Sequence, residues 1–87
     1  VFNTGGDSSI KHTGSGSFVI RNEVDNQNVS LQADNGSGGN ATYVFLDGST
    51  GEVRLNHYGA NKLATKSTGI AVTGEGIFTR RYWNGYS

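Results

Sequence analysis

The clearest structural signal in the sequence is the segment Asp47-Gly48-Ser49-Thr50-Gly51-Glu52-Val53-Arg54-Leu55-Asn56. Its first half consists of residues that form tight turns, because glycine accepts unusual backbone angles and Asp and Ser side chains bond to nearby amides. In its second half the apolar Val53 and Leu55 alternate with polar residues, a period of two that is typical of a half-buried β-strand. The segment therefore predicts a tight turn that leads into a strand.

Short strands separated by turn residues are predicted on both sides of this segment. Apolar residues alternate over 18–24, over 29–33 and over 70–72. Residues 43–46 form a continuous apolar run, which is consistent with a strand buried on both faces. No stretch has the apolar spacing of a helix, and glycine is too frequent for a helix of ordinary length. The sequence therefore predicts an all-β chain.

The composition leaves a single copy with little material for a hydrophobic core. Gly, Asn, Ser and Thr account for 40 of the 87 residues, whereas Leu, Ile, Val and Phe account for 19. The nine aromatic residues and the absence of proline argue against a disordered chain. Small chains with too little core use disulfides, metals or oligomerisation, and this chain has no Cys. We therefore expect oligomerisation.

The amount of apolar surface on each predicted strand favours three copies around one axis. Each strand carries only two or three apolar side chains on one face, whereas a monomeric sandwich needs two such faces packed about 10 Å apart. A threefold arrangement needs only a narrow apolar stripe from each chain, and it also hides strand edges. The expected fold is an elongated homotrimeric fibre of short strands wrapped about a threefold axis, similar to a triple β-helix or a β-prism.

The charge and hydropathy patterns argue against two classes of partner. The 7 basic and 7 acidic residues cancel, and no basic cluster is present of the kind that binds nucleic acid. No apolar run approaches the roughly 20 residues that span a bilayer. We therefore expect no nucleic acid partner and no membrane insertion. No signal peptide is visible, and the start at Val1 is interpreted as that of a fragment or a processed product.

The segment 47–56, together with residues 62–74, resembles a repeat common in tail fibre proteins of tailed bacteriophages. In that repeat a D-G-S-T-G turn leads to a short strand and then to a K-L-x-T step, which matches residues 62–65. The next element, S-T-G-ϕ-x-V-T-G, matches residues 67–74. Residues 11–22 and 31–38 resemble other segments of the same family. The order and combination of these motifs carry the resemblance, since each motif alone is unspecific.

The resemblance implies a structural, non-enzymatic role with no cofactor. In that family such segments form homotrimeric β-structured shafts that position a receptor-binding tip for host attachment. Residues 1–76 would be shaft repeats, and residues 77–87 would begin a following hairpin or a tip or docking segment. The implied location is the tail fibre of the virion, outside the cell. The implied partners are further copies of the chain, other tail fibre or baseplate proteins, and a host cell-surface polysaccharide.

The C-terminal segment differs from the repeat and holds the candidate binding residues. These are Arg80, Arg81, Tyr82, Trp83 and Tyr86. Their aromatic faces and guanidinium groups could bind a host-surface glycan, which gives a receptor-binding module as the alternative function. The same aromatic residues could instead cap the trimer axis or dock to a following domain. The turn signal at Asn84-Gly85 favours this packing interpretation.

Other polar residues have simpler interpretations than chemistry. His12 and His57 are far apart and lack metal-ligand spacing, so we expect polar strand residues and no metal site. Asp47 and Glu52 flank a turn, and paired carboxylates are what glycosidases use. We expect Asp47 to accept hydrogen bonds from turn amides instead. The Gly-rich stretch 34–40 lacks the signatures of calcium and phosphate loops, so a surface loop is expected there.

Overall fold

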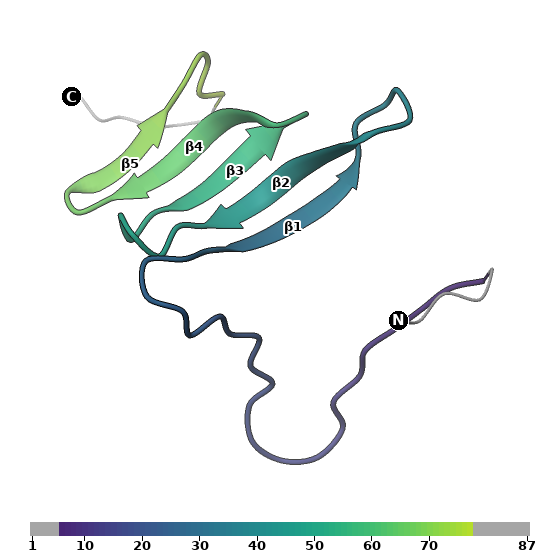
Figure 1. Ribbon diagram of the computed structural model, residues 1–87. Helices are drawn as coiled ribbons and strands as arrows, with labels where there is room; N and C mark the ends of the chain where they lie inside the picture. The colour runs from purple at the N-terminus through teal and green to yellow at the C-terminus, as the bar shows by residue number, and fades with distance from the viewer. Residues whose placement is uncertain (1–5, 78–87) are drawn as a thin grey trace, which may run out of the picture.

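The chain forms one antiparallel β-sheet preceded by an extended N-terminal arm, residues 6–28 (Figure 1). The structure is a computed structural model, and it describes residues 6–77. The strands are β1 (Val29–Asp34), β2 (Asn40–Leu46), β3 (Val53–His57), β4 (Ala60–Lys66) and β5 (Gly69–Val72). They lie in the sheet in chain order, so β1 and β5 are its two edges. The prediction of an all-β chain is confirmed.

The connection between β3 and β4 shows how local geometry sets the strand pairing. His57 pairs with Ala60, which leaves a loop of two residues, Tyr58 and Gly59. Both have positive φ angles, 49° and 86°, the combination that a two-residue type I′ hairpin requires. This turn matches the natural twist of the strands that it joins. The hairpin thereby fixes the pairing next to the turn, and the register shifts by one residue between Asn56 and Leu55.

The strands predicted from sequence are present with two exceptions. The predictions at 29–33, 53–56 and 70–72 correspond to β1, β3 and β5. The prediction of a strand over 18–24 is wrong for the single chain, because none of the strands within residues 6–77 pairs with this segment. The run at 43–46 does lie in β2, but it is half-buried or exposed and so is not buried on both faces.

Large apolar side chains gather on one face of the sheet, which we call the apolar face. Directly paired residues of antiparallel strands share a face, so the register gives its composition. One row crosses all five strands, and its members are Leu31, Val44, Leu55, Leu63 and Val72. A second row lies beside the first, and its members are Val29, Leu46, Val53, Thr65 and Ile70. The apolar face is therefore continuous from one sheet edge to the other.

The opposite face, which we call the ionic face, is covered by the chain's own side chains. Phe45 pairs with Arg54, and Arg54 pairs with Ala64. The Arg54 guanidinium lies over the Phe45 ring, 5.1 Å from its centroid. Ala64 is 4% exposed and is the only buried residue in the part of the chain that the structure describes. The single copy thus buries almost nothing, and what it buries lies on the ionic face.

Candidate interaction surface

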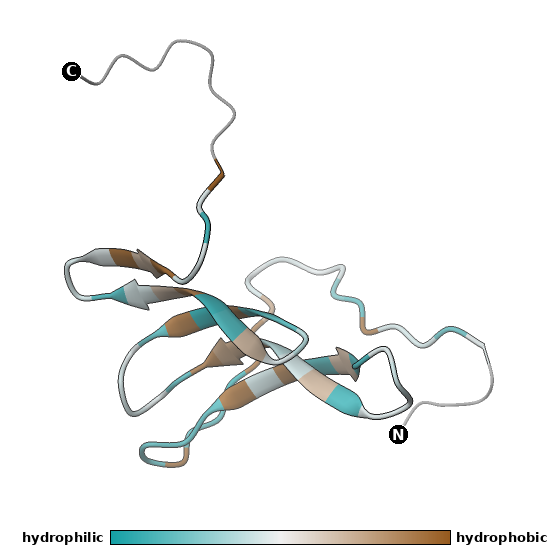
Figure 2. Ribbon diagram, turned by 90° about the horizontal axis from the view of Figure 1, so that it is seen from above, coloured by the Kyte–Doolittle hydropathy of each residue, from teal (hydrophilic) through white to brown (hydrophobic). Residues whose placement is uncertain are grey.

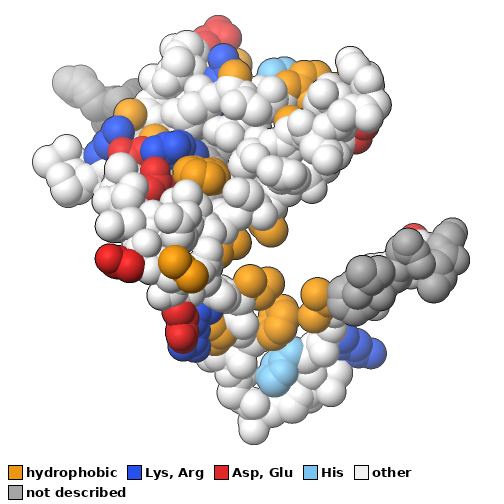
Figure 3. Space-filling view, viewed as in Figure 1, with side chains coloured by type: hydrophobic (Ala, Val, Ile, Leu, Met, Phe, Trp, Pro, Cys, Tyr) orange, Lys and Arg blue, Asp and Glu red, His pale blue; other side chains and the backbone are white. Residues whose placement is uncertain are grey.

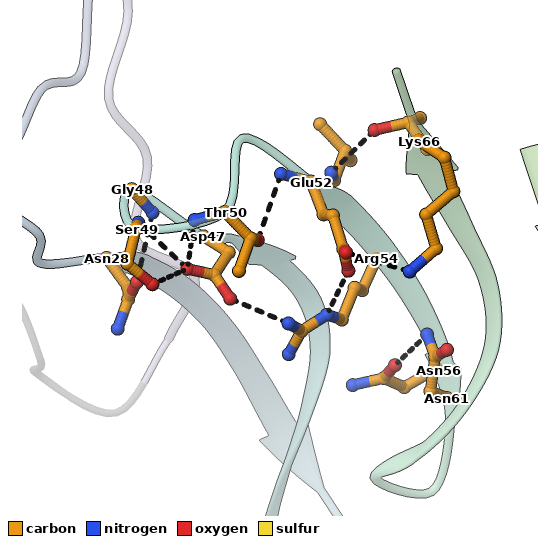
Figure 4. Close-up of polar contacts among 12 residues, drawn as sticks. Asn28, Asp47, Gly48, Ser49, Thr50, Glu52, Arg54, Asn56, Asn61 and Lys66 are labelled. Carbon is orange, nitrogen blue, oxygen red and sulfur yellow. Dashed lines mark hydrogen bonds and ion pairs between the residues drawn. The ribbon is translucent and has the colours of Figure 1, made fainter. Parts of the chain in front are cut away.

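The turn between β2 and β3 is built around the carboxylate of Asp47 (Figure 4). This carboxylate accepts hydrogen bonds from the Ser49 hydroxyl at 2.8 Å and from the Ser49 and Thr50 amides at 2.9 and 3.2 Å. These hydrogen bonds, above all those from Ser49, lower the pKa of Asp47 from 3.8 to about 2. The expectation that Asp47 accepts hydrogen bonds from turn amides is confirmed.

A chain of ion pairs runs from this turn across the ionic face. Arg54 donates to Asp47 at 2.6 Å and to Glu52 at 3.1 Å, and Lys66 donates to Glu52 at 2.8 Å. The side chains of Asp47 and Glu52 are 9% and 16% exposed. Hydrogen bonds from Lys66 and Arg54 lower the pKa of Glu52 below its ordinary value. The ion pairs therefore connect the β2–β3 turn to β3 and β4 (Figure 4).

The same contacts argue against a glycosidase role for Asp47 and Glu52. A glycosidase needs one carboxyl group with a raised pKa that stays protonated and donates a proton to the leaving group. Here the pKa values of both groups are lowered, and both carboxylates are occupied by Arg54. The arrangement supplies no proton donor, and its evident effect is to hold the turn and the strands together.

The apolar face is open to solvent. Ile70 is 64% exposed, Leu31 is 55% exposed and Leu55, at the centre of the sheet, is 45% exposed. Figure 2 shows the apolar segments recurring on neighbouring strands. Single exposed apolar residues are ordinary, but a contiguous apolar patch across a whole sheet is typical of an interaction site. The apolar face is therefore the strongest candidate functional surface among residues 6–77.

One end of the sheet and the N-terminal arm flank an open hollow of about 430 Å³. Ile20 lines it from the arm, and Val29, Leu46 and Val53 line it from the sheet. Figure 3 shows hydrophobic side chains on both sides of this opening. Just before β1, the side-chain amide of Asn22 donates a hydrogen bond to the Asn28 carbonyl at 2.9 Å, which holds the arm against the start of the strand. The arm thus adds exposed apolar surface next to the apolar face.

The remaining residues singled out from the sequence do not form a site. Arg80, Arg81, Tyr82, Trp83 and Tyr86 lie outside the described residues, so the glycan-binding alternative stays a prediction. The His12 ring stacks against Phe18 with centroids 6.2 Å apart, and the His57 ring lies 4.9 Å from that of Tyr58. Within residues 6–77 no three His, Cys, Asp or Glu side chains are grouped as metal ligands.

Sequence reasoning identified the apolar residues of β1, β2, β3 and β5 but missed β4 and the surface that the strands form together. The signal was present in the apolar residues of those four strands, but only the register shows that the rows align. Over the same described residues, no helix has the length and apolar character needed to cross a bilayer. Comparison of the chain with family models, with curated proteins and with solved structures gave no match.

Proposed function

We propose that this chain is a structural segment of a bacteriophage tail fibre. In this proposal three copies form an elongated β-structured shaft, which positions the receptor-binding tip for attachment of the virion to its host. The observation that carries the proposal is the open apolar face, supported by the order of the repeat motifs in the sequence. The partners are two further copies and the neighbouring proteins of the fibre or baseplate.

Identical copies are the partners that best fit the apolar face. The face has no charged side chain in its two rows, so it offers no ion pairs by which a charged partner would be selected. Three copies that turn these faces toward one axis bury them against one another and leave the three ionic faces outside. Closed symmetry of this kind is the usual form of soluble homo-oligomers. The result is a shaft with an apolar interior and a polar surface.

A mechanical role also fits what the ionic face contains. Its ion pairs link the turn and strands within one copy, with Asp47 and Glu52 fully engaged by Arg54 and Lys66. Such a face stiffens each sheet and presents few unsatisfied groups to a ligand. Among the described residues, no buried polar side-chain atom lacks a hydrogen-bond partner. The proposal therefore assigns no catalytic step to this segment.

The proposal is tested by placing the same charge on either face of one strand. Leu31 lies on the apolar face, and its neighbour Ser30 pairs with Phe45 on the ionic face. Both residues are exposed in the single chain. In an isolated sheet, both Leu31→Asp and Ser30→Asp would change the free energy of unfolding by only about 0.5 kcal/mol. In the proposed trimer, the three carboxylates introduced by Leu31→Asp would be buried without partners.

We expect Leu31→Asp to abolish trimer formation and Ser30→Asp to leave it unchanged, as measured by sedimentation equilibrium of the two variants. A Leu31→Asp chain that assembles as the unmodified chain does would contradict the proposal. Equal loss of assembly in both variants would contradict it as well, since the ionic face would then be part of the interface.

A further inference from the structure

We propose that residues 17–20 of the N-terminal arm of one copy pair as an added strand with the free edge of β5 in a second copy. This inference rests on the proposed homotrimer, and it specifies how neighbouring copies join. The donor segment and the acceptor edge are both present in the chain, and among residues 6–77 neither is paired with a further strand.

The donor segment has the sequence and the exposure of a strand without a sheet. Phe18, Val19 and Ile20 are aromatic and β-branched residues, which are enriched in strands. They are 54%, 57% and 64% exposed. Among the described residues, no hydrogen bond involves the backbone of 17–20. Addition of this segment to a sheet edge would give its backbone hydrogen-bond partners and would bury its apolar side chains at the same time.

The acceptor edge is unusually unprotected. β5 pairs with β4 on one side and with no described strand on the other. Edge strands normally carry Lys, Pro or inward-facing charges that prevent pairing with other chains. β5 reads Gly-Ile-Ala-Val and contains none of these. Its length of 4 residues matches the donor segment. The other edge, β1, ends in Asp34 and includes Gln32, so it is the more polar of the two edges.

The topology favours β5 of a second copy over β5 of the same copy. The arm joins the sheet at β1, and β5 is the opposite edge (Figure 1). Four strand spacings separate them, roughly 19 Å, and the arm would have to cross one face of its own sheet to reach β5. A neighbour related by a threefold axis along the strands brings its β5 edge beside β1. The arm of the first copy then lies next to that edge.

Strand direction supports the same arrangement. Because the sheet is an antiparallel meander with five strands, β1 and β5 run in the same direction. Direct contact between β1 of one copy and β5 of the next, around an axis along the strands, would therefore be parallel, and parallel pairing is slightly less stable per residue. An arm segment running opposite to β5 allows antiparallel pairing instead. With Phe18 and Ile20 on one side, it would also extend the apolar face beyond Ile70 and Val72.

Hydrogen exchange and mixed isotope labelling of the full chain test this inference. A sample is assembled from labelled and unlabelled chains, and its mass is measured. We expect nuclear Overhauser contacts between residues 17–20 of one chain and 69–72 of another. We also expect alternate amides of 69–72 to exchange at least about tenfold more slowly than in one of the two variants Phe18→Pro and Val19→Pro. Neighbouring residues of a strand point their N–H groups to opposite sides, so one of these two prolines removes an N–H that the added strand would donate to β5. Thr13→Pro, outside the donor segment, is the matched control and should retain the protection.

The outcomes separate this inference from the proposed function. A trimer whose 69–72 amides exchange freely, or whose arm contacts occur only within one chain, would overturn the inference and leave the proposed function standing. A trimer in which Phe18→Pro, Val19→Pro and Thr13→Pro all show the same protection would also overturn it. A monomer would overturn both.

Discussion

Gly48 occupies a position where the backbone of the arm comes close to the β2–β3 turn. A Cβ atom added at Gly48 would overlap the carbonyl oxygen of Gln27. The Gly48 amide also donates to the Asn28 side chain at 3.1 Å. The turn and the entry to β1 therefore hold each other in place, and this contact requires a residue without a side chain.

Substitution of this glycine tests the contact directly. Replacing Gly by Ala at an unstrained position stabilises a protein slightly through the unfolded state, so a loss of stability would report the overlap. We expect Gly48→Ala to lower the free energy of unfolding by about 2 kcal/mol, because the clash is with backbone that must move. Gly14→Ala is the control, since nothing lies within 4 Å of its added Cβ. Equal thermal stability of the two variants would show that the contact is absent.

Asp47 gives the stability of the fold a pH dependence with a definite sign. Its pKa is about 2 in the folded chain against an ordinary 3.8, so the folded state favours the charged carboxylate. The stabilisation is therefore present above about pH 4 and is lost as the pH falls toward about 2. We expect the thermal unfolding temperature to drop across this window. Asp47→Asn should be less stable at neutral pH and should show a smaller drop between about pH 4 and pH 2.

Asp25→Asn serves as the control for this measurement, because it removes a carboxylate from the arm and leaves the turn unchanged. Its profile should follow that of the unmodified chain. Parallel profiles for Asp47→Asn and the unmodified chain would contradict the assignment of the acid sensitivity to the turn.

At the scale of strands and turns, the Arg54 side chain joins β3 to the β2–β3 turn and to β2. It bonds to Asp47 in the turn and to Glu52, and it covers Phe45 of β2. Its side chain is 31% exposed, which places its ion pairs between those of the surface and those of a core. Removing it would leave Asp47 and Glu52 without their shared counter-charge and would remove the contact with the Phe45 ring.

We expect Arg54→Ala to lower the free energy of unfolding by about 2 kcal/mol, between the values typical of exposed and buried ion pairs. Arg21→Ala is a matched control, since Arg21 pairs with Glu23 while both side chains remain more than half exposed. That variant should change stability by less than about 0.5 kcal/mol. Denaturant unfolding measures both, and equal effects would contradict the role given to Arg54.

The elements also show how far sequence could predict this fold. Alternation found β1, β3 and β5 because each has apolar residues at every second position. It missed β4, where Leu63 is the only large apolar residue of the strand. It wrongly assigned a strand over 18–24, since alternation indicates which side of a segment is apolar and not whether a partner strand is near.

The candidate surface was less predictable than the strands. The role of Asp47 followed from turn chemistry, which acts over a few residues. The pairing of Lys66 with Glu52 spans 14 positions, and it depends on the register of β3 against β4. That register contains an irregularity between Leu55 and Asn56, which no local pattern reveals. Contacts that depend on register are therefore the part of the site that sequence alone could not give.

At the scale of the whole molecule, the two faces of the sheet differ. The ionic face carries ion pairs formed within one copy, whereas the apolar face presents large apolar side chains to solvent. The ionic face holds the only buried residue of the described chain, Ala64, which pairs with Arg54. The apolar face crosses all five strands, and its residues are exposed or half-buried. Because conformational order must be offset by burial, covering the apolar face would add stability to the fold. In the proposed shaft, two further copies cover it, and the arms connect neighbouring sheets.

The mass of the folded chain in dilute solution, measured by native mass spectrometry, shows whether the apolar face is covered by further copies. We predict a species with three times the chain mass of 9.2 kDa, with folded structure lost when the trimer dissociates. A monomer of 9.2 kDa that remains folded and unfolds cooperatively on dilution would contradict the proposed shaft, because the apolar face would then need no partner.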